Sequence, residues 1–148
     1  MKTILFVCTG NTFRSPMAEC YFKHLTRGKD IKVRSAGIAS IYGLPASPSA
    51  VRIMARYNQD LSSHQSQRVD RSLIEKSDMI IVMTEAHRDH LLEEWPFAQN
   101  KIFLLREFTK NPNPEKMDID DPMGGSEDYY QQSFDLMKEP LEHLAEII

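Results

Sequence analysis

Short apolar runs alternate with segments of helical periodicity along this chain, and the alternation constrains the fold more than any other feature. The runs are rich in β-branched residues, which is typical of buried strands, and they cover 3–7, 31–35, 79–83 and 102–105. Parallel strands joined by right-handed helical crossovers carry helices on both faces of their sheet. We therefore expect an α/β fold, a single-domain three-layer sandwich with a four-stranded parallel sheet.

Helix start signals separate the apolar runs. Ser15-Pro16 and Ser47-Pro48 each have the pattern of an N-cap followed by proline at the first helical position. The last helix begins near residue 126, and Pro140 is expected to kink it or start a new turn, because proline lacks a backbone donor. Residues 109–125 are rich in Pro, Asp and Asn and predict a long surface loop, and loops of that length are usually functional.

Length and charge exclude several classes of protein. A chain of 148 residues fits one domain, 1–148, and a net charge of −3 without a basic block disfavours nucleic-acid binding. The apolar run at 4–8 is too short to span a membrane or to form a signal-peptide core. Two cysteines, Cys8 and Cys20, make no disulfide framework. We expect a cytoplasmic monomer that binds neither nucleic acid nor membrane.

The segment between the first strand and the first helix has the composition of an anion-binding loop, and it lies where ligands bind in parallel sheets. Its backbone N–H groups can converge on an anion, and the positive end of the helix adds to their field. Gly10 permits close backbone approach, and Asn11 tolerates a left-handed conformation. Arg14 can hold two phosphate oxygens with its planar guanidinium. The predicted phosphate-binding residues are Thr9, Gly10, Asn11, Thr12, Phe13, Arg14 and Ser15.

Cys8 is the candidate nucleophile of this loop. Backbone donors, the helix end and Arg14 all favour its thiolate, and Ser15 can donate a hydrogen bond to the sulfur. The thiolate would attack phosphorus without a metal or a cofactor, and inorganic phosphate would be the final product after hydrolysis. The alternative is an inert buried cysteine beside residues that only cap a helix. The combination of Gly10, Asn11, Arg14 and Ser15 favours the catalytic interpretation.

The loop and several later segments resemble the low-molecular-weight protein tyrosine phosphatases. That family's signature V-C-x-G-N-x-C-R-S-P is matched by Val7-Cys8-Thr9-Gly10-Asn11-Thr12-Phe13-Arg14-Ser15-Pro16. The likeness continues through 17–19, 35–37, 64, 78–83 and 121–122, so it spans the whole chain. It implies a four-stranded parallel sheet, a cysteinyl-phosphate intermediate, a phosphorylated protein as substrate and no cofactor.

The resemblance also implies roles for individual residues. By position, Cys8 corresponds to the nucleophile, Arg14 to the phosphate clamp and Asp121 to the general acid. A carboxyl group in the 109–125 loop could protonate the leaving atom and then accept a proton from water. Asp118 and Asp120 are alternatives on the residues alone, and the resemblance selects the Asp-Pro pair. The expected supporting network is Asn11, Ser15, Ser35 and His64.

Two histidines on a predicted helix could suggest a metal site. His87 and His90 flank Asp89, but no further ligands are spaced to complete a site. We therefore expect both histidines on an exposed helical face and no bound metal.

The chain departs from tyrosine-specific relatives at several positions. Phe13 stands where those relatives usually carry a second cysteine, which can form a protective disulfide with the nucleophile. The positions that form aromatic walls of the cleft are Ile41, with Tyr42 beside it, and Met123. These departures weaken the case for phosphotyrosine as substrate.

Thr12 and the run 121–126 instead resemble the bacterial protein-arginine phosphatases, a branch of the same family. A hydroxyl tolerates a polar guanidinium beside the phosphate, whereas a larger alkyl group would crowd it. We favour phosphoarginine over phosphotyrosine. An arsenate reductase or a phosphate-binding module without catalysis remains as a more remote alternative.

Overall fold

A four-stranded parallel sheet forms the centre of the molecule in the computed structural model, which describes residues 1–148. The strands are β1 (Lys2–Cys8), β2 (Ile31–Gly37), β3 (Met79–Val82) and β4 (Ile102–Leu104). They lie in the order β2-β1-β3-β4, and all three pairings are parallel. The predicted parallel sheet is confirmed, and each strand coincides with one of the predicted apolar runs to within two residues.

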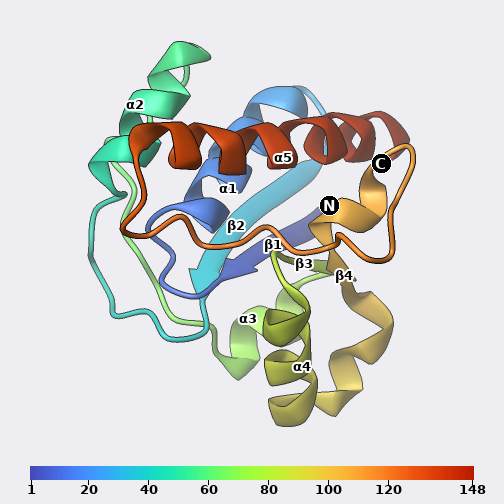
Figure 1. The fold of residues 1–148 in the computed structure, drawn as a ribbon. Coiled ribbons are helices and arrows are strands. Elements are labelled where there is room, and N and C mark those ends of the chain that lie inside the picture. Colours follow the sequence, from blue (N-terminus) through green and yellow to red (C-terminus); the bar gives the residue numbers. More distant parts are fainter.

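Helices cover both faces of this sheet (Figure 1). One layer contains α1 (Arg14–Leu25), α2 (Pro48–Arg56) and α5 (Glu127–Ile147). The other contains α3 (Arg71–Lys76), α4 (Glu85–Glu94) and the short 3-10 helix η1 (Pro96–Lys101), and a second 3-10 helix, η2 (Leu105–Phe108), follows β4. The predicted three-layer sandwich is therefore confirmed.

Side chains that alternate along β1 divide the core into two parts. Ile4, Phe6 and Cys8 belong to a cluster of 23 buried residues shared with α1 and α5. Leu5 and Val7 belong to a cluster of 11 residues on the opposite face. This is the period of two expected of a strand that is buried on both faces. Cys8 therefore shares the face of the sheet on which α1 packs.

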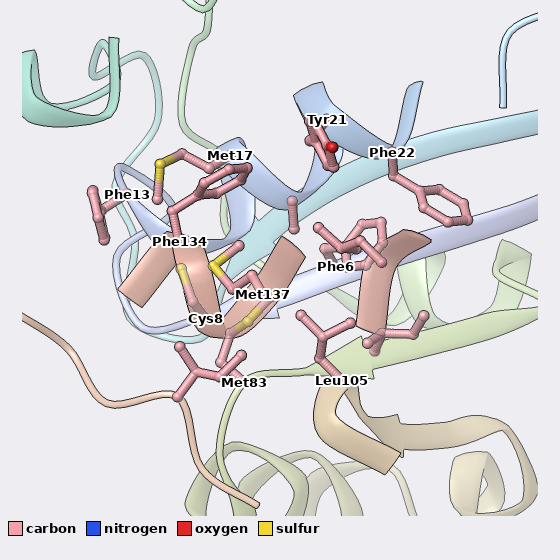
Figure 2. Packing of buried hydrophobic residues seen from close by; sticks show 14 of the residues in the cluster. Phe6, Cys8, Phe13, Met17, Tyr21, Phe22, Met83, Leu105, Phe134 and Met137 are labelled. Atoms are coloured by element: carbon pink, nitrogen blue, oxygen red, sulfur yellow. The ribbon is translucent and has the colours of Figure 1, made fainter. Parts of the chain in front are cut away.

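Aromatic contacts hold α1 and α5 against the sheet. The ring centroids of Phe6 and Phe22 lie 5.5 Å apart, and those of Tyr21 and Phe134 lie 5.3 Å apart, both edge to face. Figure 2 shows these rings in the large cluster, to which Cys8, Met83 and Met137 also belong. Because both ends of the β1–α1 loop belong to packed elements, the core fixes where the loop lies.

Helix α1 begins earlier than predicted. Its first residue is Arg14, and Phe13 is the N-cap residue, without a side-chain cap. The prediction that Ser15 is the N-cap is wrong, because the Ser15 hydroxyl instead lies 2.9 Å from the Cys8 sulfur. Pro16 is tolerated in the first turn, where backbone N–H groups have no partner within the helix. The corresponding prediction at α2 is confirmed, since Ser47 accepts a hydrogen bond from the Ala50 N–H at 3.3 Å.

The C-terminal helix α5 continues without a break past Pro140, which is buried against the core. The prediction that this proline starts a new turn is wrong, and the alternative, a kink in the helix axis, stays a prediction. Packing of Phe134, Met137 and Leu141 on the sheet supplies stabilisation that a missing backbone hydrogen bond does not outweigh. None of the helices is both long enough and apolar enough to cross a membrane.

Candidate active site

The β1–α1 loop lies at the carboxyl edge of the sheet, where three backbone hydrogen bonds connect it to the segment after β2. Ile38 N–H donates to the Cys8 carbonyl at 3.0 Å, and Ala39 N–H donates to the Thr9 carbonyl at 3.0 Å. Ser47 N–H donates to the carbonyl of Thr12 at 2.8 Å. The loop is therefore held along its length by a neighbouring segment.

Gly37, at the end of β2, allows this close approach. A Cβ atom at that position would lie 2.6 Å from the Thr9 carbonyl oxygen and 3.0 Å from the Asn11 nitrogen, so any other residue would force the backbone to shift. Gly10, in contrast, has ordinary backbone angles, and an added Cβ would meet only the Thr12 hydroxyl, at 3.8 Å. The expectation that Gly10 lets the backbone approach an anion stays a prediction, and within the protein it is Gly37 that allows the close approach.

The sulfur of Cys8 faces the loop. The Asn11 N–H donates to it at 3.3 Å, and the Ser15 hydroxyl lies 2.9 Å away. Asn11 has a positive φ of 57°, as predicted, which turns its N–H toward the sulfur. Cys8 itself is 2% exposed. Two donors are thus available to a thiolate in a site that is largely shielded from water.

A chain of side-chain hydrogen bonds determines the direction of the Ser15 proton. The Glu19 carboxylate accepts from the Ser35 hydroxyl at 2.6 Å, so Ser35 must itself accept from Asn11 Nδ2, at 3.0 Å. The second proton on Asn11 Nδ2 is donated to the Ser15 hydroxyl at 2.8 Å. Ser15 therefore keeps its own proton to donate, and the Cys8 sulfur at 2.9 Å is a nearer acceptor than the Ala36 carbonyl at 3.5 Å.

Asn11 is held by two further contacts. His64 Nε2 lies 2.8 Å from its backbone carbonyl, and the Gln67 N–H donates to its side-chain oxygen at 2.9 Å. Every polar group of Asn11 therefore has a partner. The structure brings together all four predicted members of the supporting network, Asn11, Ser15, Ser35 and His64.

The guanidinium of Arg14 is buried beside the loop, with 4% of the residue exposed. Its Nη1 donates to the Ile119 carbonyl at 2.8 Å, and its Nη2 donates to the Thr9 hydroxyl at 3.4 Å. Two acceptors from different segments thus fix the plane of the guanidinium. A fixed fork at the mouth of an amide-lined loop suits the oxygens of a phosphoryl group.

The loop from 109 to 126 crosses this edge of the sheet between the two helical layers (Figure 1, orange). Ile119 is fully buried, and its N–H donates to the Met83 carbonyl at 2.9 Å. Asp121, two residues on, has a carboxylate oxygen 3.9 Å from Arg14 Nη2, and 40% of its side chain is exposed. Asp118 instead accepts from the N–H of Glu85, at the start of α4. Of the aspartates considered, Asp121 has an ion-pair contact with Arg14.

The remaining loop residues differ in where their side chains lie. Phe13 is buried in the core, edge to face with Tyr130 at 4.7 Å, so only its backbone can face a ligand. Thr12 is half-buried, and its hydroxyl has no hydrogen-bond partner within the protein. Ile41, Tyr42 and Met123 are 63%, 67% and 79% exposed, which agrees with positions on a rim.

Two clefts adjoin the site. One of about 490 Å³ lies beside Asp121 and is bordered by Met123, Tyr129 and Leu136. A larger one of about 660 Å³ lies behind the loop, where Cys20, Ser35 and other residues of α1 and β2 line it. No group of three or more His, Cys, Asp or Glu side chains is arranged to hold a metal ion.

Glu19, Gln67 and His87 were not predicted as site residues. Glu19 could have been found, because it lies one helical turn after Ser15 on α1. The expectation that His87 is exposed is wrong: it is 4% exposed, and its Nε2 lies 2.9 Å from the Thr9 hydroxyl. Burial, together with the positive charge of Arg14, lowers the pKa of His87 to about 4. Its place in the first turn after a strand of the sheet was the available signal.

The chain is similar to known phosphatases over almost its whole length. Residues 3–148 match the family described as low molecular weight phosphotyrosine protein phosphatase. The protein-arginine-phosphatase of Bacillus subtilis (strain 168) is 37% identical over 144 residues, which cover 96% of this chain and 93% of that protein. The probable low molecular weight protein-tyrosine-phosphatase EpsP of Ralstonia solanacearum is 40% identical over 122 residues, which cover 82% and 79%.

A solved structure agrees with these matches. The YwlE arginine phosphatase, in a mutant form with a phosphorylated active-site serine, has a TM-score of 0.88 and 35% identity, covering 97% of this chain and 93% of that one. The chain therefore belongs to the low molecular weight phosphotyrosine protein phosphatase family. It is a hydrolase of the protein phosphatase class.

Proposed function

We propose that Cys8 hydrolyses phosphorylated proteins through a cysteinyl-phosphate intermediate, with phosphoarginine preferred as substrate. The observation that carries the proposal is the environment of one sulfur, which has the Asn11 N–H at 3.3 Å and the Ser15 hydroxyl at 2.9 Å. The buried Arg14 guanidinium beside the same loop supports a phosphoryl ligand. These features together suit nucleophilic attack on phosphorus.

The first step transfers the phosphoryl group to the enzyme. The Cys8 thiolate forms a bond to phosphorus while the bond from phosphorus to the leaving oxygen or nitrogen breaks. Asp121 donates its proton to that leaving atom. Arg14 and the loop N–H groups stabilise the equatorial oxygens of the transition state. The position of Asp121, 3.9 Å from Arg14 Nη2, supports this role over Asp118 and Asp120.

The second step releases inorganic phosphate. Asp121, now a carboxylate, accepts a proton from a water molecule whose oxygen attacks phosphorus. The phosphorus–sulfur bond breaks, and Cys8 leaves as a thiolate that Ser15 stabilises. The YwlE variant with a phosphorylated serine in its active site supports a covalent phosphoenzyme on this fold.

Thr12 supports phosphoarginine as the preferred substrate. Its hydroxyl is free of partners in the protein and the residue is only partly buried, so a guanidinium N–H can donate to it. The exposed Ile41 and Met123 offer no aromatic ring on which a phenol would stack. The arginine phosphatase of Bacillus subtilis is also similar over more of the chain than EpsP is. Phosphotyrosine remains the alternative, since EpsP is 40% identical.

A comparison of matched peptides tests the substrate. Two peptides that differ only in carrying phosphoarginine or phosphotyrosine are assayed as substrates. The enzymes compared are the parent and the variants Thr12→Val and Thr12→Ile. We expect the parent to prefer phosphoarginine. Thr12→Ile should lower the kcat/KM for the phosphoarginine peptide by roughly tenfold, since one methylene in a pocket changes kcat/KM by about 10- to 200-fold. Thr12→Val keeps the size of the side chain and removes its hydroxyl, so it separates the loss of the hydroxyl from the crowding by a larger alkyl group. A parent enzyme that leaves phosphoarginine untouched would exclude this substrate.

The Cys8→Ser variant separates catalysis from mere binding. A phosphatase should lose turnover and keep its affinity for inorganic phosphate, whereas a phosphate-binding module would lose nothing measurable. An arsenate reductase would need further cysteines to complete a redox relay, and Cys20 is the only other one in the chain. Arsenate-dependent oxidation of a thiol cofactor by the parent enzyme would favour that alternative.

We also propose that the enzyme acts as a cytoplasmic monomer that binds neither nucleic acid nor membrane. A reducing compartment keeps the Cys8 sulfur reduced and out of disulfides, and both cysteines are free. Every residue assigned a role comes from one chain, so a second copy is not required. Sedimentation at working concentration measures the oligomeric state directly.

A further inference from the structure

His87 connects α4 to the phosphate loop through one side chain. It is the third residue of α4, and its backbone N–H is donated to the helix cap Thr84 at 3.1 Å. Its Nε2 lies 2.9 Å from the Thr9 hydroxyl, while its Nδ1 is buried without a hydrogen-bond partner. Arg14 Nη2 donates to the same hydroxyl at 3.4 Å. Thr9 therefore lies between a buried histidine and the phosphate clamp.

The unpaired nitrogen identifies the tautomer of the neutral ring. If Nδ1 carried the proton, a buried donor would be left without an acceptor, which is rare in folded proteins. If Nε2 carries it, only an acceptor is left unpaired, which occurs more often. Nε2 then donates to Thr9, so that the Thr9 oxygen accepts from both His87 and Arg14. The Thr9 proton must be directed elsewhere, and Thr9 is exposed at the mouth of the loop.

We propose that His87 is a positioning residue that holds the Thr9 hydroxyl as a donor to the substrate phosphoryl group and as a support for Arg14. This proposal rests on the phosphatase function given above. The titratable and charged groups that act electrostatically on the ring are Arg14 from α1, Asp118 and Asp121 from the loop before α5, and His90 on its own helix. A neutral His87 keeps a second positive charge away from Arg14.

Paired variants of His87 and Thr9 test the proposal, with para-nitrophenyl phosphate as the substrate. His87→Leu keeps the apolar volume and removes the donor, and Thr9→Val removes the hydroxyl. His87→Leu should lower kcat/KM at least about tenfold, and Thr9→Val should lower it by up to the roughly 100- to 1,000-fold loss of a deleted donor that contacts the transition state directly. The kcat/KM of the double variant should be no lower than that of the more damaging single variant, because both substitutions remove the same hydrogen bond between His87 and Thr9.

Conservative and control variants exclude a purely structural role. His87→Gln can place a neutral N–H donor near the Nε2 position, so it should retain kcat/KM within about threefold, whereas His90→Leu changes an exposed histidine of the same helix and should have no effect. The NMR chemical shifts of the His87 ring nitrogens at pH 7 should show that the proton is on Nε2. Effects of His87→Leu and Thr9→Val that multiply, a proton on Nδ1, or full turnover by a folded His87→Leu would overturn the proposal.

The proposed function can fail independently of this one. If the parent enzyme hydrolyses the substrate and Cys8→Ser abolishes this hydrolysis, the phosphatase assignment stands, whatever the effect of His87→Leu. Hydrolysis that persists in Cys8→Ser would overturn the assignment and, with it, the role given to His87. A thermal melt of each variant verifies that it is folded.

Discussion

Phe13 and Cys20 determine how the Cys8 thiol responds to oxidation. Phe13 stands at the position where tyrosine-specific relatives usually carry a second loop cysteine, and its ring lies in the core against Tyr130. Cys20 is a poor substitute, because burial and the nearby negative charge of Glu19 raise the pKa of its thiol. A protonated thiol attacks a sulfenic acid slowly. The oxidised nucleophile therefore has no partner with which to form a protective disulfide.

We expect stoichiometric peroxide to inactivate the enzyme with only partial recovery on addition of excess thiol. Without a disulfide, the sulfenic acid of Cys8 proceeds to sulfinic and sulfonic acids, which thiols do not reduce. Residual phosphatase activity and the mass of the Cys8 peptide measure the outcome. Cys20→Ser should behave like the parent protein. Full recovery of the parent by thiol would contradict the prediction.

At the scale of elements, the distance between β2 and the β1–α1 loop depends on Gly37. Its missing side chain leaves room for the Thr9 carbonyl and the Asn11 nitrogen, both of which belong to the phosphate loop. The loop in turn receives hydrogen bonds from Ile38 and Ala39 directly after the glycine. Movement of β2 should therefore move the loop.

We expect Gly37→Ala to destabilise the fold and to reduce activity together. A Cβ atom 2.6 Å from a backbone oxygen forces the strand or the loop to shift, and such overpacking costs about 1–3 kcal/mol. Urea denaturation and kcat/KM measure the two effects. Gly28→Ala is the control, because Gly28 has a φ of 88°, with open space around it and no contact with the loop. That variant should lose stability without losing activity per folded molecule.

For the whole molecule, the sequence predicts what is encoded locally. The four strands follow from apolar runs, and Cys8, Asn11 and Arg14 follow from one loop. Ser15 was misplaced as a helix cap, because its hydroxyl has a tertiary partner that helix signals do not reveal. Gln67 and His87 come from other segments and become site residues only when the sheet brings them to Asn11 and Thr9. The place of His87 just after a strand indicates the edge of the sheet on which it lies, but its contact with Thr9 and that of Gln67 with Asn11 depend on the fold.

The burial of His87 couples the stability of the whole fold to pH. Desolvation and the charge of Arg14 lower its pKa from 6.5 to about 4 in the native state. Between these values the unfolded chain binds more protons than the native protein, so this contribution to stability rises with pH and is lost as the pH falls from 6.5 toward 4. The full shift corresponds to roughly 3 kcal/mol, because one pKa unit is worth about 1.4 kcal/mol.

His87→Gln should remove this dependence, since the amide does not titrate. Urea denaturation at pH 7 and at pH 4.5 gives the free energy of unfolding of the parent and of the variant. We expect the parent to lose roughly 2 kcal/mol more than His87→Gln between the two pH values, because most of the window has then been crossed. His90→Gln alters an exposed histidine and should follow the parent. Equal losses in the parent and His87→Gln would mean that His87 titrates normally, and that its ring is not held in the buried position which the contact with Thr9 requires.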